Sequence, residues 1–181
     1  MTKKRCEWTN SHELFIPYHD KEWGVPVHDD RLLFEMLNLE GAQAGLSWLV
    51  VLKKRAEYLK VFDNFKAKKI IKYDAKKRAA LMKNPGIVRN RLKINGVIEN
   101  AKAYLQVQEE FGTFDKYIWQ FIGGKPIRGG KLRTTCTESI VMSKALKKRG
   151  FKFVGDTICY AFMQAVGMIN DHSSSCFRIK K

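Results

Sequence analysis

Four side chains that can bind a soft metal ion stand in two pairs near opposite ends of the sequence. Cys6 and His19 form the first pair, and His172 and Cys176, at positions i and i+4, form the second. Two thiols and two imidazoles make the tetrahedral set that Zn²⁺ favours, and four protein ligands leave no open position for water. The set therefore predicts a structural zinc site that ties the two ends of the chain together. Spacing alone equally allows His172 to cap the preceding helix and Cys176 to be an incidental thiol.

One carboxylate, Glu40, falls on the apolar face of an expected helix. Leu33, Met36 and Leu37 define that face, and Glu40 follows them at positions i+7, i+4 and i+3. Because burial of an unpaired charge is costly, Glu40 should meet an internal Arg or Lys, border a wet cleft, or accept hydrogen bonds from a ligand. The sequence leaves an internal ion pair as open as a binding role.

The segments around this helix are rich in aromatic residues, namely Trp8, Phe15, Tyr18, Trp23 and Trp48. Aromatic faces stack on nucleobases, and a carboxylate accepts hydrogen bonds from exocyclic amino groups. Together they are the side chains that a pocket for an extruded base requires. For any single ring, packing in the core is the alternative. Trp48, at an expected helix start, favours a cleft more than the others do.

A turn at 84–91 joins two expected helices and could hold a phosphate. The first amides of the second helix would point outward, and Gly86 carries no side chain to obstruct close approach. Val88, Arg89 and Arg91 follow in the same turn, which resembles a helix-hairpin-helix. The chain has 34 Lys and Arg against 18 Asp and Glu, a net charge of +16, so a polyanion is the first partner to consider. The basic clusters 53–55 and 147–149 could add phosphate contacts or simply be solvated faces.

The periodicity predicts an all-α protein. Asp29, Asp30 and Asp74 are natural N-caps, and Thr135 with Glu138 resembles a capping box. No convincing pair of alternating strands is present, and 123–131 is expected to be a glycine-rich basic loop. The expected helices are two within 32–62, separated at 45–47, and others at 74–83, from about 90 over four turns, 114–122, 139–149 and 155–168.

Length and composition limit the classes of protein to consider. With 181 residues, of which 45% are hydrophobic, the chain can bury a core as one unit over 1–181, with the hairpin within about 60–115. Charged residues interrupt every apolar run, so no membrane span or secretory signal is expected. Four scattered cysteines do not make a disulfide scaffold. We therefore expect a cytoplasmic monomer.

Several longer motifs point to one family. The sequence resembles the bacterial DNA-3-methyladenine glycosylase I family, within the helix-hairpin-helix glycosylase superfamily, over nearly the whole chain. The resemblance is carried by Tyr18-His19-Asp20, Glu22-Trp23-Gly24, Leu39-Glu40-Gly41, the run 43–48 (QAGLSW), the run 144–155 (KALKKRGFKFVG), and Asn170-Asp171-His172 with Cys176.

The resemblance implies a helical glycosylase that flips 3-methyladenine out of double-stranded DNA and hydrolyses its N-glycosidic bond, leaving an abasic site. It implies structural zinc on Cys6, His19, His172 and Cys176. It also implies that Glu40 binds the flipped base and that Gly45 and Leu46 fill the gap in the duplex. Tyr18, Trp48, Trp8 and Phe15 would then form or adjoin the pocket.

Some points remain alternatives at this stage. The chain departs from its relatives at Phe15, where Tyr is expected, at Ala42, where a relative has Gln, and at Pro85 in the hairpin. No lysine stands out as a desolvated nucleophile, so we predict a monofunctional enzyme without a lyase step. A zinc-stabilised DNA-binding module without catalysis is the alternative, although it does not explain Glu40.

Overall fold

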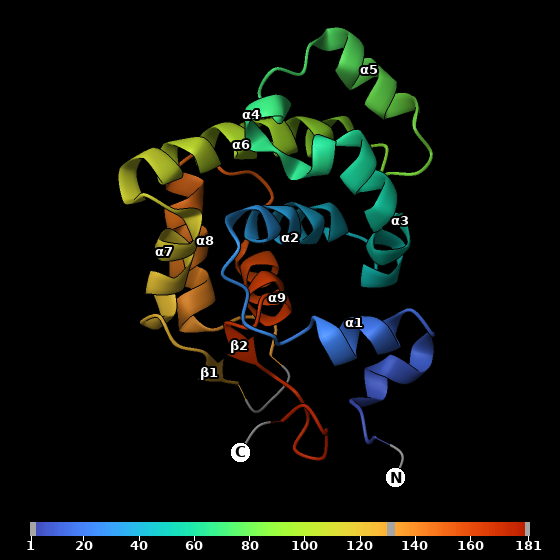
Figure 1. Cartoon of the computed structure of the whole chain (residues 1–181), viewed down its shortest axis with the longest axis vertical. Helices are drawn as coiled ribbons and strands as arrows, with labels where there is room; N and C mark the ends of the chain where they lie inside the picture. Colours follow the sequence, from blue (N-terminus) through green and yellow to red (C-terminus); the bar gives the residue numbers. More distant parts are fainter. Residues whose placement is uncertain (1–2, 130–132, 180–181) are drawn as a thin grey trace.

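The computed structural model describes residues 3–129 and 133–179 and is mostly helical (Figure 1). Short 3₁₀ segments and one minimal parallel pairing complete it. The elements are η1 (Glu7–Ser11), α1 (Phe15–Lys21), α2 (Asp30–Gln43), α3 (Trp48–Val61), η2 (Asp63–Phe65), α4 (Ala67–Ile70), α5 (Ala75–Lys83), α6 (Arg91–Phe111), α7 (Phe114–Trp119), η3 (Gln120–Ile122), β1 (Ile127–Arg128), α8 (Thr137–Lys148), α9 (Asp156–Ala165) and β2 (Ile169–Asn170).

Helix α2 lies in the middle of the molecule, between α6 and α9 (Figure 1). Every residue from 33 to 42 is buried, so this stretch has no solvent face. Asp29 caps its start by accepting a hydrogen bond from the Leu32 amide at 2.7 Å. The sequence indicated one apolar face on this helix, whereas in the structure the stretch 33–42 is buried on all sides.

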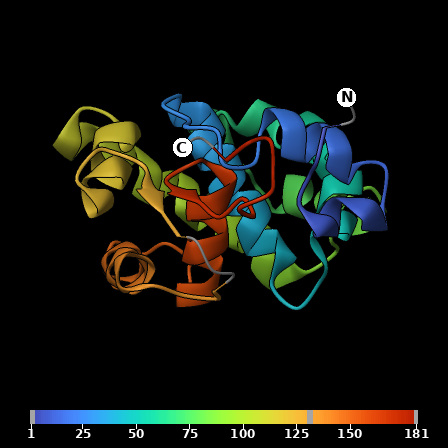
Figure 2. The same cartoon turned by 90° about the horizontal axis from the view of Figure 1, so that it is seen from below.

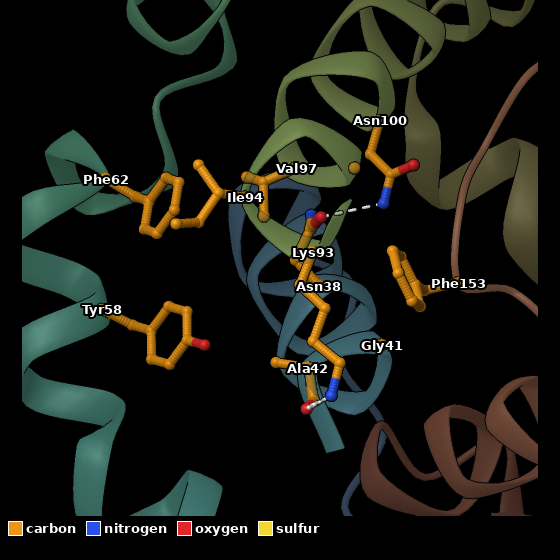
Figure 3. Close-up of a pocket in the computed structure, with 11 residues that line it drawn as sticks. Asn38, Gly41, Ala42, Tyr58, Phe62, Lys93, Ile94, Val97, Asn100 and Phe153 are labelled. Atoms are coloured by element: carbon orange, nitrogen blue, oxygen red, sulfur yellow. Dashed lines mark hydrogen bonds between the residues drawn. The ribbon is translucent and has the colours of Figure 1, made fainter. Parts of the chain in front are cut away.

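Polar contacts from α6 hold α2 in place (Figure 3). Asn100 donates to Asn38 Oδ1 at 2.9 Å and also contacts the Lys152 carbonyl. Lys93 Nζ donates to the carbonyls of Ala42 and Ala44, at 2.8 and 2.6 Å, and so satisfies the C-terminal end of α2. Only a small cavity of about 10 Å³ remains at this junction.

Phe153 wedges between α2 and α6 at two glycines. A Cβ at Gly41 would lie 3.0 Å from Phe153 Cβ, and one at Gly96 would lie 2.9 Å from its ring. Phe153 itself has a φ of 55°, a left-handed conformation that costs energy for a bulky residue. The close packing of α2 against α6 therefore depends on two positions without side chains.

Several sequence expectations are confirmed, and two are wrong. Asp74 caps α5 as expected, and α6 begins near residue 90 as expected. Its cap, which was not predicted from the sequence, is Asn90, whose side chain accepts from the amides of Leu92 and Lys93. The capping box of α8 is made by Cys136 and Ser139, not by Thr135 and Glu138, because the helix begins one residue later. The expectation of no strands is also wrong, since β1 and β2 pair in parallel, with Ile127 opposite Ile169. Two residues are too few for a strand to show alternation.

The two ends of the described chain lie on the same side of the molecule, the side that faces the viewer in Figure 2. The Phe177 amide donates to the Lys4 carbonyl at 2.9 Å. Residues 130–132, within the basic loop expected from the sequence, lie outside the described residues. Within 3–129 and 133–179, no helix has the length and apolar character needed to cross a membrane.

Candidate active site

A cavity of about 370 Å³ opens where η1, α1, α2, α3 and α9 meet. The residues around it are mainly aromatic, with one carboxyl and two amides among them. They are Trp8, Ser11, Phe15, Tyr18, Trp23, Glu40, Gln43, Trp48, Ala161 and Gln164. All five side chains predicted for base recognition thus border the same cavity.

Glu40 is buried on the cavity wall and has no cationic partner among the described residues. Its side chain belongs to a residue that is only 3% exposed, and its Oε2 atom has no hydrogen-bond partner. Burial raises the pKa of Glu40 to about 8. The internal ion pair that the sequence left open is therefore not formed. An unsatisfied buried carboxyl beside an open cavity is suited to bind a ligand.

The internal ion pair forms instead at Glu35, one and a half turns earlier on α2. Arg31 and Arg55 both donate to its carboxylate at 2.8 Å, and Arg55 also binds Glu22. Because Glu22 follows α1 and Arg55 lies on α3, this network ties together the helices that surround Glu40. Arg55, from the basic cluster 53–55, thus has a structural role.

The aromatic side chains of the cavity pack against one another, Trp8 and Phe15 edge to face and Tyr18 and Trp48 tilted by 45°. Tyr18 and Trp48 have ring centroids 5.4 Å apart, and Trp8 lies 5.5 Å from Phe15. The Trp48 Nε1 atom is buried without a hydrogen-bond partner. Burial and the charge of Glu40 hold the pKa of Tyr18 well above its usual value. Among the described residues, Trp48 and Glu40 thus each line the cavity and each carry one buried polar atom without a partner.

The residues expected to bind metal converge just behind this aromatic wall. Ligand atoms of Cys6, His19 and Cys176 all lie within 4.8 Å of one another. His172 lies next to this group, with its ring centroid 4.9 Å from that of His19. Its Nε2 atom is buried and has no partner. The structure thus brings all four predicted side chains together across the two ends of the chain.

Comparison with known proteins identifies the family. The model of the family described as methyladenine glycosylase matches residues 8–179. The chain belongs to this family. A DNA-3-methyladenine glycosylase of Haemophilus influenzae is 48% identical over 177 residues, which cover 95% of this chain and 96% of the relative.

Solved structures of the family have the same fold. A crystal structure of 3-methyladenine DNA glycosylase I matches with a TM-score of 0.95 at 46% identity, covering 98% of this chain and 100% of that one. A variant of a 3-methyladenine DNA glycosylase I, crystallised in complex with 3-methyladenine, matches with a TM-score of 0.93 at 32% identity, covering 98% of each chain. The methyladenine glycosylase fold therefore spans the described residues.

Gly45 and Leu46 lie at the mouth of the cavity, in the α2–α3 turn. Gly45 has a φ of 75°, which favours glycine, and Leu46 is 41% exposed. Their neighbours Gln43 and Trp48 line the cavity. Leu46 is thus an exposed apolar side chain on a turn whose Ala44 carbonyl is held by Lys93.

The hairpin residues lie away from the cavity, between α5 and α6. Gly86 packs against α3: a Cβ there would lie 2.4 Å from the Cγ atom of Glu57. The Val88 amide donates to Tyr58 OH at 3.2 Å and also faces inward. Arg89 and Arg91 are exposed. The side chain of Asn90 already accepts from two of the first amides of α6, so these amides are not free to bind an anion. The guanidinium groups of Arg89 and Arg91 are the main hydrogen-bond donors that the hairpin exposes.

The three departures from the family pattern fit this structure. Phe15 lies edge-on to Trp8 without needing a hydroxyl, and the carbonyls of Ala42 and Pro85 accept from Lys93 and Lys54. The basic cluster 147–149 is also partly internal, since Arg149 binds Glu110 and lies over the Phe111 ring.

Sequence reasoning missed the two glutamines of the cavity, Gln43 and Gln164. Gln164 lies on α9, the most apolar helix of the chain, among Phe162, Met163 and Ala165. Glu40 was identified because it is a polar residue on the apolar face of a helix. The same criterion, applied to α9, identifies Gln164.

Proposed function

We propose that the cavity beside Glu40 receives a 3-methyladenine base extruded from DNA, and that the chain hydrolyses the bond joining this base to its sugar. The observation that carries the proposal is the unpaired, buried carboxyl among aromatic rings, in a member of the methyladenine glycosylase family. Flat rings and polar edge groups are what an extruded purine requires. A family member crystallised in complex with 3-methyladenine supports the same ligand.

Methylation at N3 makes the base cationic, so it is already a good leaving group. When the bond between sugar C1′ and the base breaks, its electron pair neutralises the base. Water then adds at the cationic C1′ and releases one proton to solvent, which leaves the neutral abasic sugar. A nearby cation lowers the pKa of a carboxyl group, so a cationic base entering the cavity favours the ionised form of Glu40. That negative charge then stabilises the positive charge that develops on the sugar, provided it does not favour the bound substrate equally.

We propose a monofunctional reaction because, among the described residues, no lysine lines the cavity. Lys93 is the nearest candidate by burial, which lowers its pKa, but its ammonium group binds the carbonyls that end α2. A Schiff base would require a free amine at the sugar. The reaction is therefore hydrolysis by water.

Zn²⁺ fits the Cys/His cluster, and we propose it as a structural ion. His19 Nδ1 contacts Asp20, and His172 Nδ1 contacts Asn170 Oδ1, both at 2.9 Å, which leaves each Nε2 atom free to bind metal. Amide groups of Ser173 and Arg178 donate to Cys6 and Cys176 sulfur, as expected for thiolates. Bound zinc would fix the two ends of the chain behind the cavity.

The hairpin formed by α5, the turn 84–90 and α6 is proposed as the helix-hairpin-helix element that binds the DNA backbone. Its support is the exposure of Arg89 and Arg91 together with the net charge of +16. The alternative, a DNA-binding module without catalysis, leaves the cavity and its unpaired carboxyl without a purpose.

A release assay tests the proposed function. Methylated duplex DNA is incubated with the protein, and free bases are separated by chromatography. The enzyme should release 3-methyladenine, and borohydride should trap no covalent protein–DNA adduct. Binding without release would instead favour the module, and a trapped adduct would establish a lyase step.

A further inference from the structure

A second polar group, Gln164, borders the base cavity from a helix other than α2. It lies on α9, which packs directly against α2, and both Gln164 and Ala161, one turn earlier, line the cavity. The small side chain of Ala161 leaves the amide of Gln164 accessible from the cavity. Glu40 and Gln164 thus present polar groups to the same space from two different helices.

The amide of Gln164 is held in one orientation by Asp171. Its Nε2 atom donates to Asp171 Oδ2 at 2.7 Å, and Tyr160 OH donates to the same oxygen at 2.6 Å. A carboxylate oxygen that accepts from both must be faced by the NH₂ group of Gln164. The carbonyl atom Oε1 then remains for the cavity, and no described residue donates to it.

Asp171 has little freedom to release this amide. A Cβ at Gly129 would lie 1.7 Å from Asp171 Oδ1, so the backbone of β1's end closes directly over the carboxylate. Asp171 also follows directly after β2, whose pairing with β1 fixes its position. The orientation of Gln164 is therefore set by the fold and not by the ligand.

Resting on the proposed function, we infer that Gln164 is a specificity-determining residue that accepts a hydrogen bond from the exocyclic amino group of the extruded base. An amino group has two hydrogens, and the residues that line the cavity supply two acceptors for them, the carboxyl group of Glu40 and Gln164 Oε1. A purine with a carbonyl oxygen at the same position, such as 3-methylguanine, places an acceptor against the fixed Gln164 acceptor. Such a mismatch leaves buried polar groups unpaired and is rejected.

The test compares release of 3-methyladenine and 3-methylguanine from the same methylated DNA. Gln164→Met keeps the length of the side chain but removes both polar atoms. We expect its kcat/KM for 3-methyladenine to fall roughly 3- to 10-fold, the effect of one hydrogen bond, while that for 3-methylguanine does not fall. The ratio of the two should therefore decrease by the same factor.

Tyr160→Phe is the matched variant, because it removes the other donor to Asp171 Oδ2 and keeps both polar atoms of Gln164. It should retain a ratio closer to that of the wild type than Gln164→Met does. A ratio unchanged in Gln164→Met, or changed equally in both variants, would overturn the inference. Melting curves establish that each variant is folded, and Gln164→Leu replaces the Met variant if that one is not.

Base release by the wild-type protein distinguishes a failure of the proposed function from a failure of the inference about Gln164. If the wild type releases no 3-methyladenine, the proposed function fails. If it releases 3-methyladenine and the ratio does not depend on Gln164, only the present inference fails.

Discussion

Tyr18 and His19 are consecutive residues of α1 that serve two different sites. Tyr18 lines the base cavity, whereas His19 belongs to the Cys/His cluster. Trp8 contacts both, with ring centroids 6.4 Å from Tyr18 and 5.3 Å from His19. The proposed zinc site and the proposed base site are therefore in direct contact, through adjacent residues of α1.

Loss of one zinc ligand should for this reason disturb the cavity as well as the fold. We expect Cys176→Ser to lose bound zinc and to lower Tm by about 10 °C. Tryptophan fluorescence should change too, because Trp8 and Trp23 pack on the cluster. Cys136→Ser is the control, since Cys136 lies outside the cluster at the start of α8. Equal zinc content in both variants would contradict the assignment.

Glu40→Gln should separate base excision from DNA binding. We expect kcat to fall about 100-fold or more, because the charge that stabilises the transition state is lost. Binding to abasic DNA should change less than about threefold, since no base meets Glu40 there. Gel shifts and base release on the same preparations measure both quantities.

Glu35→Gln provides the matched control on the same helix. Glu35 is buried but bound to Arg31 and Arg55, so its loss should lower stability by about 1–3 kcal/mol. Excision by the folded fraction should remain near that of the wild type. Equal loss of excision in the two variants would remove the special role of Glu40.

The raised pKa of Glu40 predicts a specific dependence of stability on pH. The folded state keeps a proton up to about pH 8, whereas the unfolded state releases it near pH 4.5. The wild type should therefore lose stability relative to Glu40→Gln as pH rises between these values. At about 1.4 kcal/mol per pKa unit, the change approaches about 5 kcal/mol. Urea unfolding of both proteins across this range measures it, and a difference independent of pH would show that the carboxyl is solvated.

Arg89 and Arg91 should contribute to binding of every duplex alike. Replacing either with Ala should weaken binding to damaged and undamaged DNA by a similar factor and reduce the salt slope of log K by about 1. Titrations at several salt concentrations provide the slope. An effect confined to methylated DNA would place these residues at the base and not at the backbone.

The sequence predicted the structure best at positions where one residue type has one well-defined structural role. The caps Asp29 and Asp74 located helix starts, because their side chains supply the acceptors that the first amides of a helix lack. Glu40 stood out because a carboxylate on an apolar face needs an explanation. Whether that explanation was an ion pair or a cavity could not be read from spacing, since Arg55 reaches Glu35 across twenty positions.

Other features depend on packing between distant segments. Gly86 was interpreted as making room for a phosphate, but its neighbour is Glu57 on α3. The left-handed Phe153 has no sequence signature, because only the glycines of two other helices make its position possible. The orientation of Gln164 likewise depends on Asp171, which no local pattern connects to it.

Helix α2 is clamped from both sides, by Phe153 at its glycine and by Lys93 at its end, whereas the rings of the cavity come from separate neighbouring segments. The position of the Glu40 carboxyl group is thus fixed by the packing of α2. The aromatic residues around it belong to other elements and can be substituted without moving α2. A change of substrate within this family would then arise by substitution of those aromatic residues, on η1, α1 or α3, around a carboxyl group whose position does not change.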